Sequence, residues 1–339
     1  MKKRILPLLL ALLLLAGCNL LADPNTDTAA PAERSIWAMD TQMDLRIYGN
    51  PQLKNGTLLD SLCAALGDLD RELSATDGDS ALSALNRAGS TDNEHLVSLA
   101  ARAKEISQLT GGALDITLYP ASLAWGFTQE THQIPSPETL EALKDKVGMD
   151  RITLEGNKLS LAPNTQLDLG ALAKGYAADL LREMMEDSHT PGILSLGGNI
   201  QTVGTKPDGS DWVIGVQDPE DAGRYSLTLR IQGAKSVVTS GDYQRYFMED
   251  GVRYCHILDP KTLAPVRGSL RAVTVVADSG LRADALSTAL FVLGREAGEA
   301  LWRSQRDFEA IWMEADGSIW ITPGLEALTS GDPFTVIQP

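Results

Sequence analysis

The sequence is poor in histidine, cysteine and positive charge, and these shortages argue against several classes of function. The four histidines show no metal-ligand spacing, which argues against a zinc site. The formal charge of −16 repels nucleic acid, so we expect no nucleic-acid partner. The sequence also lacks a Walker A motif and the glycine fingerprint of dinucleotide-binding folds. Any phosphate-bearing ligand would therefore have to be held by local positive charge.

The first 17 residues are typical of a bacterial lipoprotein signal peptide. Three basic residues at positions 2–4 precede an apolar run over 5–16, shorter than the roughly 20 residues that span a bilayer. The run ends in Leu-Ala-Gly-Cys18, which resembles the lipobox, where small residues precede a cysteine that becomes lipidated. We predict cleavage before Cys18 and a lipid anchor on it. The alternative is an ordinary signal peptide followed by a chance cysteine.

Residues 18–34 are predicted to be a flexible tether, because Asp, Pro, Thr and Ala dominate them. Residues 35–339 have a globular composition and suffice for one large core or two closely packed subdomains. Loss of the basic signal segment brings the charge to −19. Asn19 follows the cysteine, which by resemblance to enterobacterial sorting favours the inner leaflet of the outer membrane. We expect the periplasmic side of a bacterial membrane, inner or outer.

Hydrophobic periodicity predicts intermixed helices and short strands from residue 35 onward. Helices are predicted at 59–73, 93–109, 137–147, 171–185 and 283–293. Strands are predicted at 35–48, 151–154, 158–161, 192–196, 212–217, 226–231, 236–239, 254–258, 271–277 and 308–313, and residues 115–127 are predicted to be irregular. Helices and antiparallel-looking strands alternate without βαβ regularity, which favours an α+β or mixed α/β fold.

Cys63 and Cys255 are the cysteines that remain in the mature chain. Cys63 lies beside an apolar helical stripe, which favours a small, buried, hydrophobic role. A disulfide between the two cysteines is the alternative in an oxidising compartment.

Three residues in the second half of the chain could take part in binding a phosphate group with a metal ion. Lys174 falls in the first turn of its helix, where it opposes the helix dipole. It either faces an anion bound at that helix end or is solvated at the surface. Asp284 and Thr288 share a helix face and offer oxygen ligands of the kind that Mg²⁺ uses beside substrate phosphates. The alternative is that Asp284 favours the N-terminus of its own helix.

Two further segments could contribute to a reaction. His256 lies where a strand runs into an Asp-Pro turn, so it is either an acid–base group or a packed structural residue. The segment 195–199 lacks the Gly-x-Ser-x-Gly frame of a hydrolase and fits a glycine turn that lets the backbone approach a ligand.

In series, these segments resemble the FAD:protein FMN transferases, the flavin transferase lipoproteins of the ApbE type. The matching segments are Met39-Asp40-Thr41, Leu73-Ser74 with Asp79-Ser80 and Asn86, 110–117 with 125–127, 168–179, 196–199, 239–243, 256–262 and 283–288. The resemblance extends from about residue 36 to the end. It rests on the series, since no single motif is specific.

The resemblance implies that FAD lies in a cleft between two closely packed subdomains, with Mg²⁺ at its pyrophosphate. The residues expected at the FAD are Met39, Thr76, Ala113, Leu114, Asp115, Asp168, Lys174 and Leu258. The expected Mg²⁺ ligands are the backbone carbonyl of Ala171 and the side chains of Asp284 and Thr288, with Ser287 as a reserve.

The sequence departs from the family pattern at two positions. Asp40 replaces the usual glycine of Met-Gly-Thr, which places an acidic side chain where the backbone normally passes close to the ligand. Thr76 stands where many members place an aromatic residue against the flavin, so stacking there is expected to be weaker.

The implied activity is a Mg²⁺-dependent transfer of FMN from FAD to a threonine hydroxyl of a target protein, with release of AMP. His256 is the candidate base, and Asp284 acts in catalysis through the metal. The expected acceptors are proteins of membrane redox complexes. Two alternatives are a Mg²⁺-dependent FAD pyrophosphatase and a non-enzymatic FAD-binding lipoprotein. The Asp284 and Thr288 pair argues against the second, because a pure binder needs no metal at the pyrophosphate.

Overall fold

The computed structural model describes residues 31–49, 55–129 and 131–339. The predicted signal peptide, Cys18 and most of the predicted tether lie outside these residues. None of the helices in the described ranges combines the length and apolar character that a membrane crossing requires.

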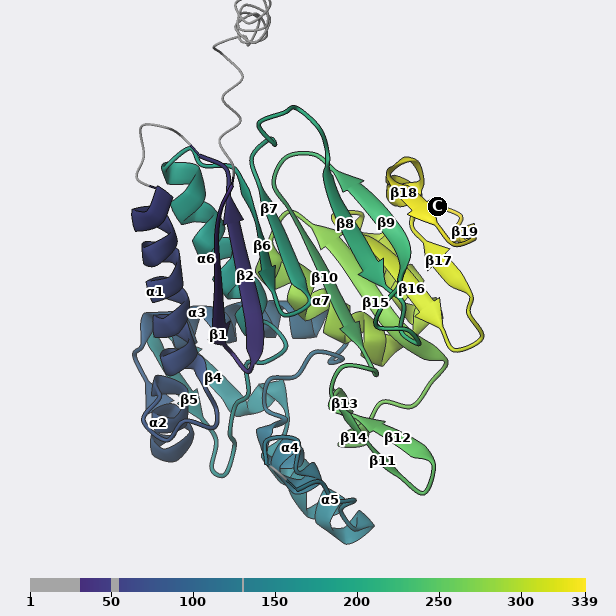
Figure 1. Cartoon of the computed structure of the whole chain (residues 1–339). Helices are drawn as coiled ribbons and strands as arrows, with labels where there is room; N and C mark the ends of the chain where they lie inside the picture. Colours follow the sequence, from purple (N-terminus) through teal and green to yellow (C-terminus); the bar gives the residue numbers. More distant parts are fainter. Residues whose placement is uncertain (1–30, 50–54, 130) are drawn as a thin grey trace, which may run out of the picture.

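The body of the protein is a nine-stranded sheet in the order β1-β2-β6-β7-β10-β15-β16-β17-β19 (Figure 1). The strands are β1 Ala32–Ala38, β2 Thr41–Ile47, β6 Gly192–Leu196, β7 Asn199–Val203, β10 Lys235–Gly241, β15 Leu270–Ala277, β16 Glu309–Glu314, β17 Ile319–Ile321 and β19 Thr335–Val336. Neighbouring strands are antiparallel except β17 and β19. Met43 of β2 pairs with Leu196 of β6, so the β1–β2 and β6–β7 turns lie at the same end of the sheet.

Helices cover one face of this sheet (Figure 1). They are α1 Asn55–Leu73, α6 Ala173–Asp187, α7 Gly280–Leu293 and α8 Arg295–Gln305. Helix α7 carries apolar residues on all sides, as expected of a buried helix, and packs against β10, β15 and α6. Along β15, Val273 and Val275 join the core on the helical side, whereas Ala272 and Val276 join the core on the other side. This alternation follows from the period of two in a strand.

A three-stranded sheet in the order β18-β9-β8 covers the opposite face (Figure 1). Its strands are β8 Trp212–Gln217, β9 Tyr225–Ile231 and β18 Thr329–Gly331, with the short helix η3 Pro323–Leu328 before β18. Trp212 and Leu229 of this sheet pack with Ile311 of the large sheet in a second core. The body therefore has three layers, with the large sheet in the middle.

Two smaller groups of elements complete the fold. The first contains α2 Ala81–Ala88, β3 Ser90–Thr91, α3 Glu94–Leu109, β4 Ile152–Glu155, β5 Lys158–Leu161 and the 3-10 turns η1 Lys144–Lys146 and η2 Met149–Arg151. The second contains α4 Tyr119–Trp125, α5 Pro137–Leu143, β11 Tyr246–Glu249, β12 Val252–Cys255, β13 Leu258–Asp259 and β14 Ala264–Pro265. This second group lies below the sheet in Figure 1 and has its own apolar cluster, in which Trp125 Nε1 donates to the Leu263 carbonyl at 2.8 Å.

The predicted mixed α/β class is confirmed, and each predicted helix is present with shifted ends. Three local predictions are wrong. Residues 115–127 contain α4. Pro120 does not interrupt this helix, because it stands in the first turn, where its missing N–H costs nothing. Residues 35–48 form a hairpin instead of one segment, since Met39 and Asp40 turn the chain. The predicted strand 254–258 is split between β12 and β13 at His256.

Both cysteines of the globular part are free thiols, Cys63 half-buried and Cys255 buried. Burial raises the pKa of the Cys255 thiol to about 11. The structure therefore agrees with a packing role for these cysteines.

Candidate active site

Two hairpin turns lie side by side at one end of the large sheet. Met39 and Asp40 join β1 to β2 with φ angles of 49° and 59°. Gly197 and Gly198 join β6 to β7 with φ angles of 59° and 91°. A Cβ added to Gly197 would lie 2.3 Å from the Thr41 Cγ2 atom, so glycine is needed for the two turns to meet.

Strand β10 links these turns to helix α7. The Thr239 amide donates to the Gly198 carbonyl at 3.2 Å. The Ser240 hydroxyl lies 2.8 Å from the Ser287 hydroxyl and 3.2 Å from the Thr288 hydroxyl. The Ser287 hydroxyl also donates to the carbonyl of Asp284 at 2.9 Å, so it is already engaged within the fold.

Helices α6 and α7 cross at two glycines. A Cβ on Gly175 would lie 2.2 Å from the Gly280 carbonyl oxygen, and one on Gly280 would lie 2.5 Å from the Gly175 carbonyl oxygen. This close approach lets Asp284 of α7 reach the N-terminus of α6, where its Oδ2 accepts from the Gly175 amide at 2.8 Å. The Asp284 side chain is buried and lies beyond the first turn of α7. The alternative that Asp284 serves its own helix N-terminus is therefore wrong, because it caps α6.

One backbone carbonyl, that of Ala171, lies just outside α6, one residue before the N-cap Leu172. Gly175 is the third residue of α6, so its amide is one of the amides at a helix start that have no partner within the helix. It donates to Asp284, and among the described residues no backbone amide bonds the Ala171 carbonyl. Leu172, at the N-cap of α6, provides no side-chain cap. A buried carboxylate therefore caps the positive end of α6, and Ala171 precedes the first residue of this helix by two positions.

The oxygen groups at this point match those that Mg²⁺ takes from proteins. Mg²⁺ uses one or two carboxylates and keeps places for substrate phosphates and water. Ala171, Asp284 and Thr288 offer a carbonyl, one carboxylate and a hydroxyl, which fits that pattern. In the residues that the structure describes, no group of three His, Cys, Asp or Glu could hold a metal ion. A metal held by these three residues would keep places open for phosphate oxygens and water.

Lys174 lies in the first turn of α6, as predicted. Its ammonium group is 3.5 Å from the Gly170 carbonyl. The positive charge of Lys174 also contributes to lowering the pKa of His256, so the two side chains are close enough to interact. Lys174 belongs to the body of the protein, whereas His256 belongs to the smaller group around β11–β14. The candidate site therefore lies where these two parts meet.

His256 is held by the backbone of Arg245. Its Nδ1 lies 3.2 Å from the Arg245 carbonyl oxygen. Because a carbonyl only accepts, Nδ1 carries the hydrogen and Nε2 keeps a free lone pair. Burial, followed by the charges of Arg245 and Lys174, lowers the pKa of His256 from 6.5 to about 4. The imidazole is therefore neutral at physiological pH and able to accept a proton at Nε2.

Two carboxylates lie in adjoining loops, Asp115 between α3 and α4 and Asp168 between β5 and α6. The Asp168 amide donates to the Ile116 carbonyl at 2.8 Å, which joins the loops. Asp168 Oδ1 accepts from the Gly170 amide at 2.8 Å. Asp115 Oδ1 accepts from the Thr117 amide at 2.7 Å and from the Thr117 hydroxyl at 2.6 Å. Burial raises the pKa of Asp115, because it disfavours the charged form.

The chain is similar to known proteins over most of its length. Residues 39–312 match the family model described as the ApbE family. The chain belongs to the ApbE family. The FAD:protein FMN transferase of Vibrio cholerae serotype O1 is 32% identical to it over 305 residues, which are 86% of this chain and 88% of that protein.

Two solved structures share the ApbE fold with this chain. The crystal structure of the ApbE protein from Thermotoga maritima has a TM-score of 0.83 at 28% identity and covers 88% of this chain and 99% of its own. The apo form of the flavinyl transferase ApbE from Pseudomonas stutzeri has a TM-score of 0.79 at 31% identity and covers 88% of this chain and 96% of its own.

Three of the residues that the ApbE resemblance places at the FAD could contact it only through their backbone groups. Ala113, Leu114 and Leu258 are 7%, 1% and 4% exposed, so their side chains belong to the apolar clusters. Only their backbone groups are suited to face a ligand. Their contact with FAD stays a prediction.

The remaining implied contacts lie in turns. The Met39 amide donates to Asp70 Oδ1 at 2.9 Å, which fixes the β1–β2 turn against α1. Asp40 is exposed in that turn, and its positive φ is one that Asp tolerates better than most residues. Thr76 is exposed beside Ser74, whose hydroxyl oxygen accepts from the Thr76 amide at 3.3 Å.

Three further residues, Ser240, Asp179 and Asn199, belong to the site or support it in the structure, and no sequence motif singles them out. Ser240 contacts Thr288, and Asp179 caps α7. Asn199 is buried at the β6–β7 turn, and its Nδ2 has no hydrogen-bond partner among the described residues. All three fall inside the segments that match the ApbE family, which was the one signal that could have found them.

Proposed function

We propose that this chain cleaves FAD with the help of Mg²⁺, transfers the FMN phosphoryl group to a threonine hydroxyl of an acceptor protein and releases AMP. Flavin transfer itself follows from the ApbE family and from relatives named FAD:protein FMN transferase, and the chain is an enzyme of that class. The metal and the threonine are the finer parts of the proposal. The observation that carries the metal is the contact of Asp284 with the Gly175 amide, which places a buried carboxylate at the start of α6, the helix that directly follows Ala171 and Leu172.

The residues around this contact are suited to hold a dinucleotide. Ala171, Asp284 and Thr288 would hold Mg²⁺, which when bound would neutralise charge on the pyrophosphate and on the departing AMP. Lys174 adds a positive charge in the same turn of α6, where the helix dipole also favours an anion. In a chain with a formal charge of −16, these groups supply the local positive potential that FAD needs.

His256 is suited to act as the base. Its Nε2 would take the proton of the acceptor threonine as the threonine oxygen bonds to the phosphorus on the FMN side. The bond from that phosphorus to the AMP oxygen breaks, and AMP leaves with the electron pair. The hydrogen bond from Nδ1 to the Arg245 carbonyl keeps the imidazole in the tautomer that this step requires.

We also propose that the enzyme is anchored through Cys18 on the periplasmic side of a bacterial membrane. The support is the lipobox-like segment and the tether that follows it. Its acceptors would then be proteins of membrane redox complexes that expose their threonines on the same side.

The test is mass spectrometry of a flavin-accepting protein after incubation with FAD, Mg²⁺ and the purified full chain in detergent. We expect the mass of one FMN phosphoryl group on a threonine, and no addition when a chelator is present. Release of AMP at full rate without an acceptor would instead favour the pyrophosphatase. Bound FAD that stays intact with both Mg²⁺ and the acceptor would favour the FAD-binding lipoprotein.

A further inference from the structure

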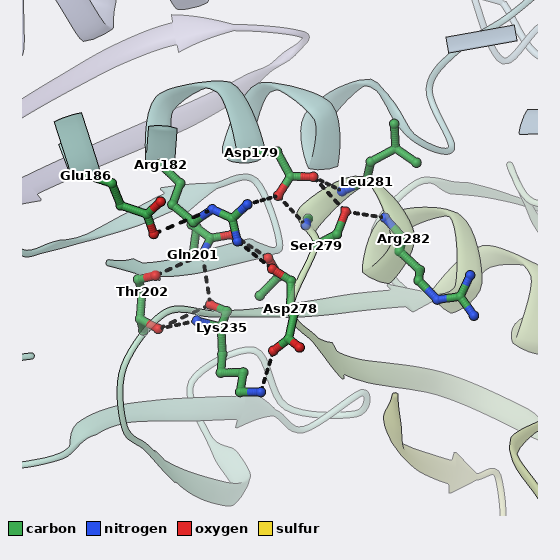
Figure 2. A network of polar contacts seen from close by, with 12 residues as sticks. Asp179, Arg182, Glu186, Gln201, Thr202, Lys235, Asp278, Ser279, Leu281 and Arg282 are labelled. Atoms are coloured by element: carbon green, nitrogen blue, oxygen red, sulfur yellow. Dashed lines mark hydrogen bonds and ion pairs between the residues drawn. The ribbon is translucent and has the colours of Figure 1, made fainter. Parts of the chain in front are cut away.

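The start of helix α7 is held by a side chain of helix α6 (Figure 2). Asp179 Oδ1 accepts from the Gly280 amide at 2.7 Å. Asp179 Oδ2 accepts from the Leu281 amide at 3.0 Å and from the Ser279 hydroxyl at 2.7 Å. The carboxylate therefore satisfies two of the free amides at the helix start, together with the hydroxyl of the N-cap residue.

The two helices cap each other. Asp179 of α6 caps α7, and Asp284 of α7 caps α6 through Gly175. In each helix the aspartate follows the crossing glycine by four residues, from Gly175 to Asp179 and from Gly280 to Asp284. Four residues are about one helical turn, so each carboxylate lies on the same face as the glycine before it. The crossing thus has an approximate twofold arrangement.

Asp179 is itself fixed by its surroundings. An Arg182 terminal nitrogen (Nη2) lies 3.6 Å from Asp179 Oδ1, and the other (Nη1) donates to the Asp278 carbonyl at 2.6 Å. The Asp278 carboxylate is in turn paired with Lys235 of β10 (Figure 2). Asp179 is therefore fixed to Arg182 of its own helix α6 and, through Arg182 and Asp278, to Lys235 of the sheet.

We propose that Asp179 is a positioning residue for the Mg²⁺ ligands. Asp284 lies one turn after Gly280, so the position at which Asp179 holds the start of α7 also sets where Asp284 meets the Gly175 amide. Without the cap, the start of α7 loses two amide hydrogen bonds, and the position of Asp284 against Gly175 is held less firmly. This inference rests on the proposed metal role of Asp284.

The test measures metal binding directly, by electron paramagnetic resonance titration of Mn²⁺ into the full chain in detergent with FAD present and no acceptor. Asp179→Ala should raise the Mn²⁺ concentration at half-saturation about tenfold, the range typical of groups that orient a metal ligand. Asp179→Asn keeps one acceptor oxygen and should have a smaller effect in the same direction. Hydrogen exchange of the segment around Gly175 should be faster in both variants, because its amide loses a fixed acceptor.

Asn93→Ala is the matched control. Asn93 caps α3 by accepting from the Leu96 amide at 2.9 Å, so its loss also removes a helix cap. We expect a lower Tm in this control and an unchanged Mn²⁺ curve. If Asp179→Ala fails to fold, the Mn²⁺ titration of Asp179→Asn tests the positioning role.

Asp284→Ala separates this inference from the proposed function. If Asp284→Ala loses Mn²⁺ binding while both Asp179 variants bind as the parent does, the positioning role is overturned and the metal site stands. If Asp284→Ala itself binds Mn²⁺ unchanged, both the metal site and the positioning role are overturned.

Discussion

Asp284 of helix α7 accepts a hydrogen bond from the Gly175 amide of helix α6, at 2.8 Å. This carboxylate therefore holds two helices together and also lies at the candidate metal site. A single substitution such as Asp284→Ala would disturb both properties at once, so the two have to be separated by the choice of variant.

Asp284→Asn should separate the cap from the metal ligand. The amide oxygen of asparagine can still accept from Gly175, so the Tm should fall less than in Asp284→Ala, which loses a cap worth about 1 kcal/mol. Both variants lose the negative charge, and both should reduce FMN transfer by about 100-fold or more. Thermal melting and the mass-spectrometric transfer assay measure the two effects. Full transfer by Asp284→Asn would show that the charge is not needed for a metal.

Gly175→Ala should be strongly destabilising, although alanine normally favours helices. Its Cβ would lie 2.2 Å from the Gly280 carbonyl oxygen and 2.6 Å from the Asp284 Cβ, so the helices would have to separate. We expect a loss of about 2 kcal/mol or more in the free energy of unfolding, together with a loss of transfer.

Gly67→Ala in the middle of α1 is the control for that substitution. A Cβ there meets no heavy atom within 4 Å, so the change should raise stability by about 0.5–1 kcal/mol. Urea unfolding of both variants gives the comparison. Equal effects of the two substitutions, or a stable and active Gly175→Ala, would rule out the close crossing.

His256 should make folding stability depend on pH between 6.5 and about 4. Its pKa is lowered in the folded state, so in this range the unfolded chain binds more protons at this residue and stability falls as the pH falls. In His256→Asn the decline over this range should be shallower, which urea unfolding at several pH values would measure. The same variant should lower kcat for transfer by about 100-fold or more if His256 is the base. Unchanged kcat would make it a packed structural residue.

The two thiols should react at very different rates. Cys255 is buried with a pKa of about 11, so little thiolate forms at pH 8, whereas Cys63 is half-buried. Alkylation of the folded chain followed by mass spectrometry should modify Cys63 first. If both thiols react only after denaturation with a reductant, and not after denaturation alone, the chain carries a disulfide instead.

Asp40→Gly should be tolerated by the fold and should strengthen the binding of FAD. The residue has a φ of 59°, which glycine adopts without strain, so the Tm should stay equal or rise slightly. Removal of a negative charge from the turn should lower the KM for FAD, because FAD is an anion. Asp44→Asn, which removes a charge on the same hairpin but within β2, is the control and should leave the KM unchanged. A KM that does not move in Asp40→Gly would place FAD away from this turn.

The elements that could be predicted from the sequence are those with strong local patterns. The leucine stripe of α1 and the polar start of α3 needed no information from the rest of the chain. Helix α4 was missed because its proline suggested a break, and α8 because little of it is apolar.

The candidate site, too, could be predicted only where it depends on neighbouring residues in the sequence. Lys174 could be placed in a first turn, because that depends on a few neighbouring residues. The contact between Asp284 and Gly175 could not be predicted, because it joins residues 109 positions apart and depends on how two helices cross. Local periodicity carries no information on such a pairing.

The adjacent hairpin turns of β1–β2 and β6–β7 determine how rigid the candidate site is. Each turn has two residues, and the strands on either side are paired along their whole length. The turns therefore lose their conformational freedom when the sheet forms, and ligand binding does not have to order them. We expect FAD to meet a surface already shaped for it, with its binding energy available for affinity instead of being used to order the chain.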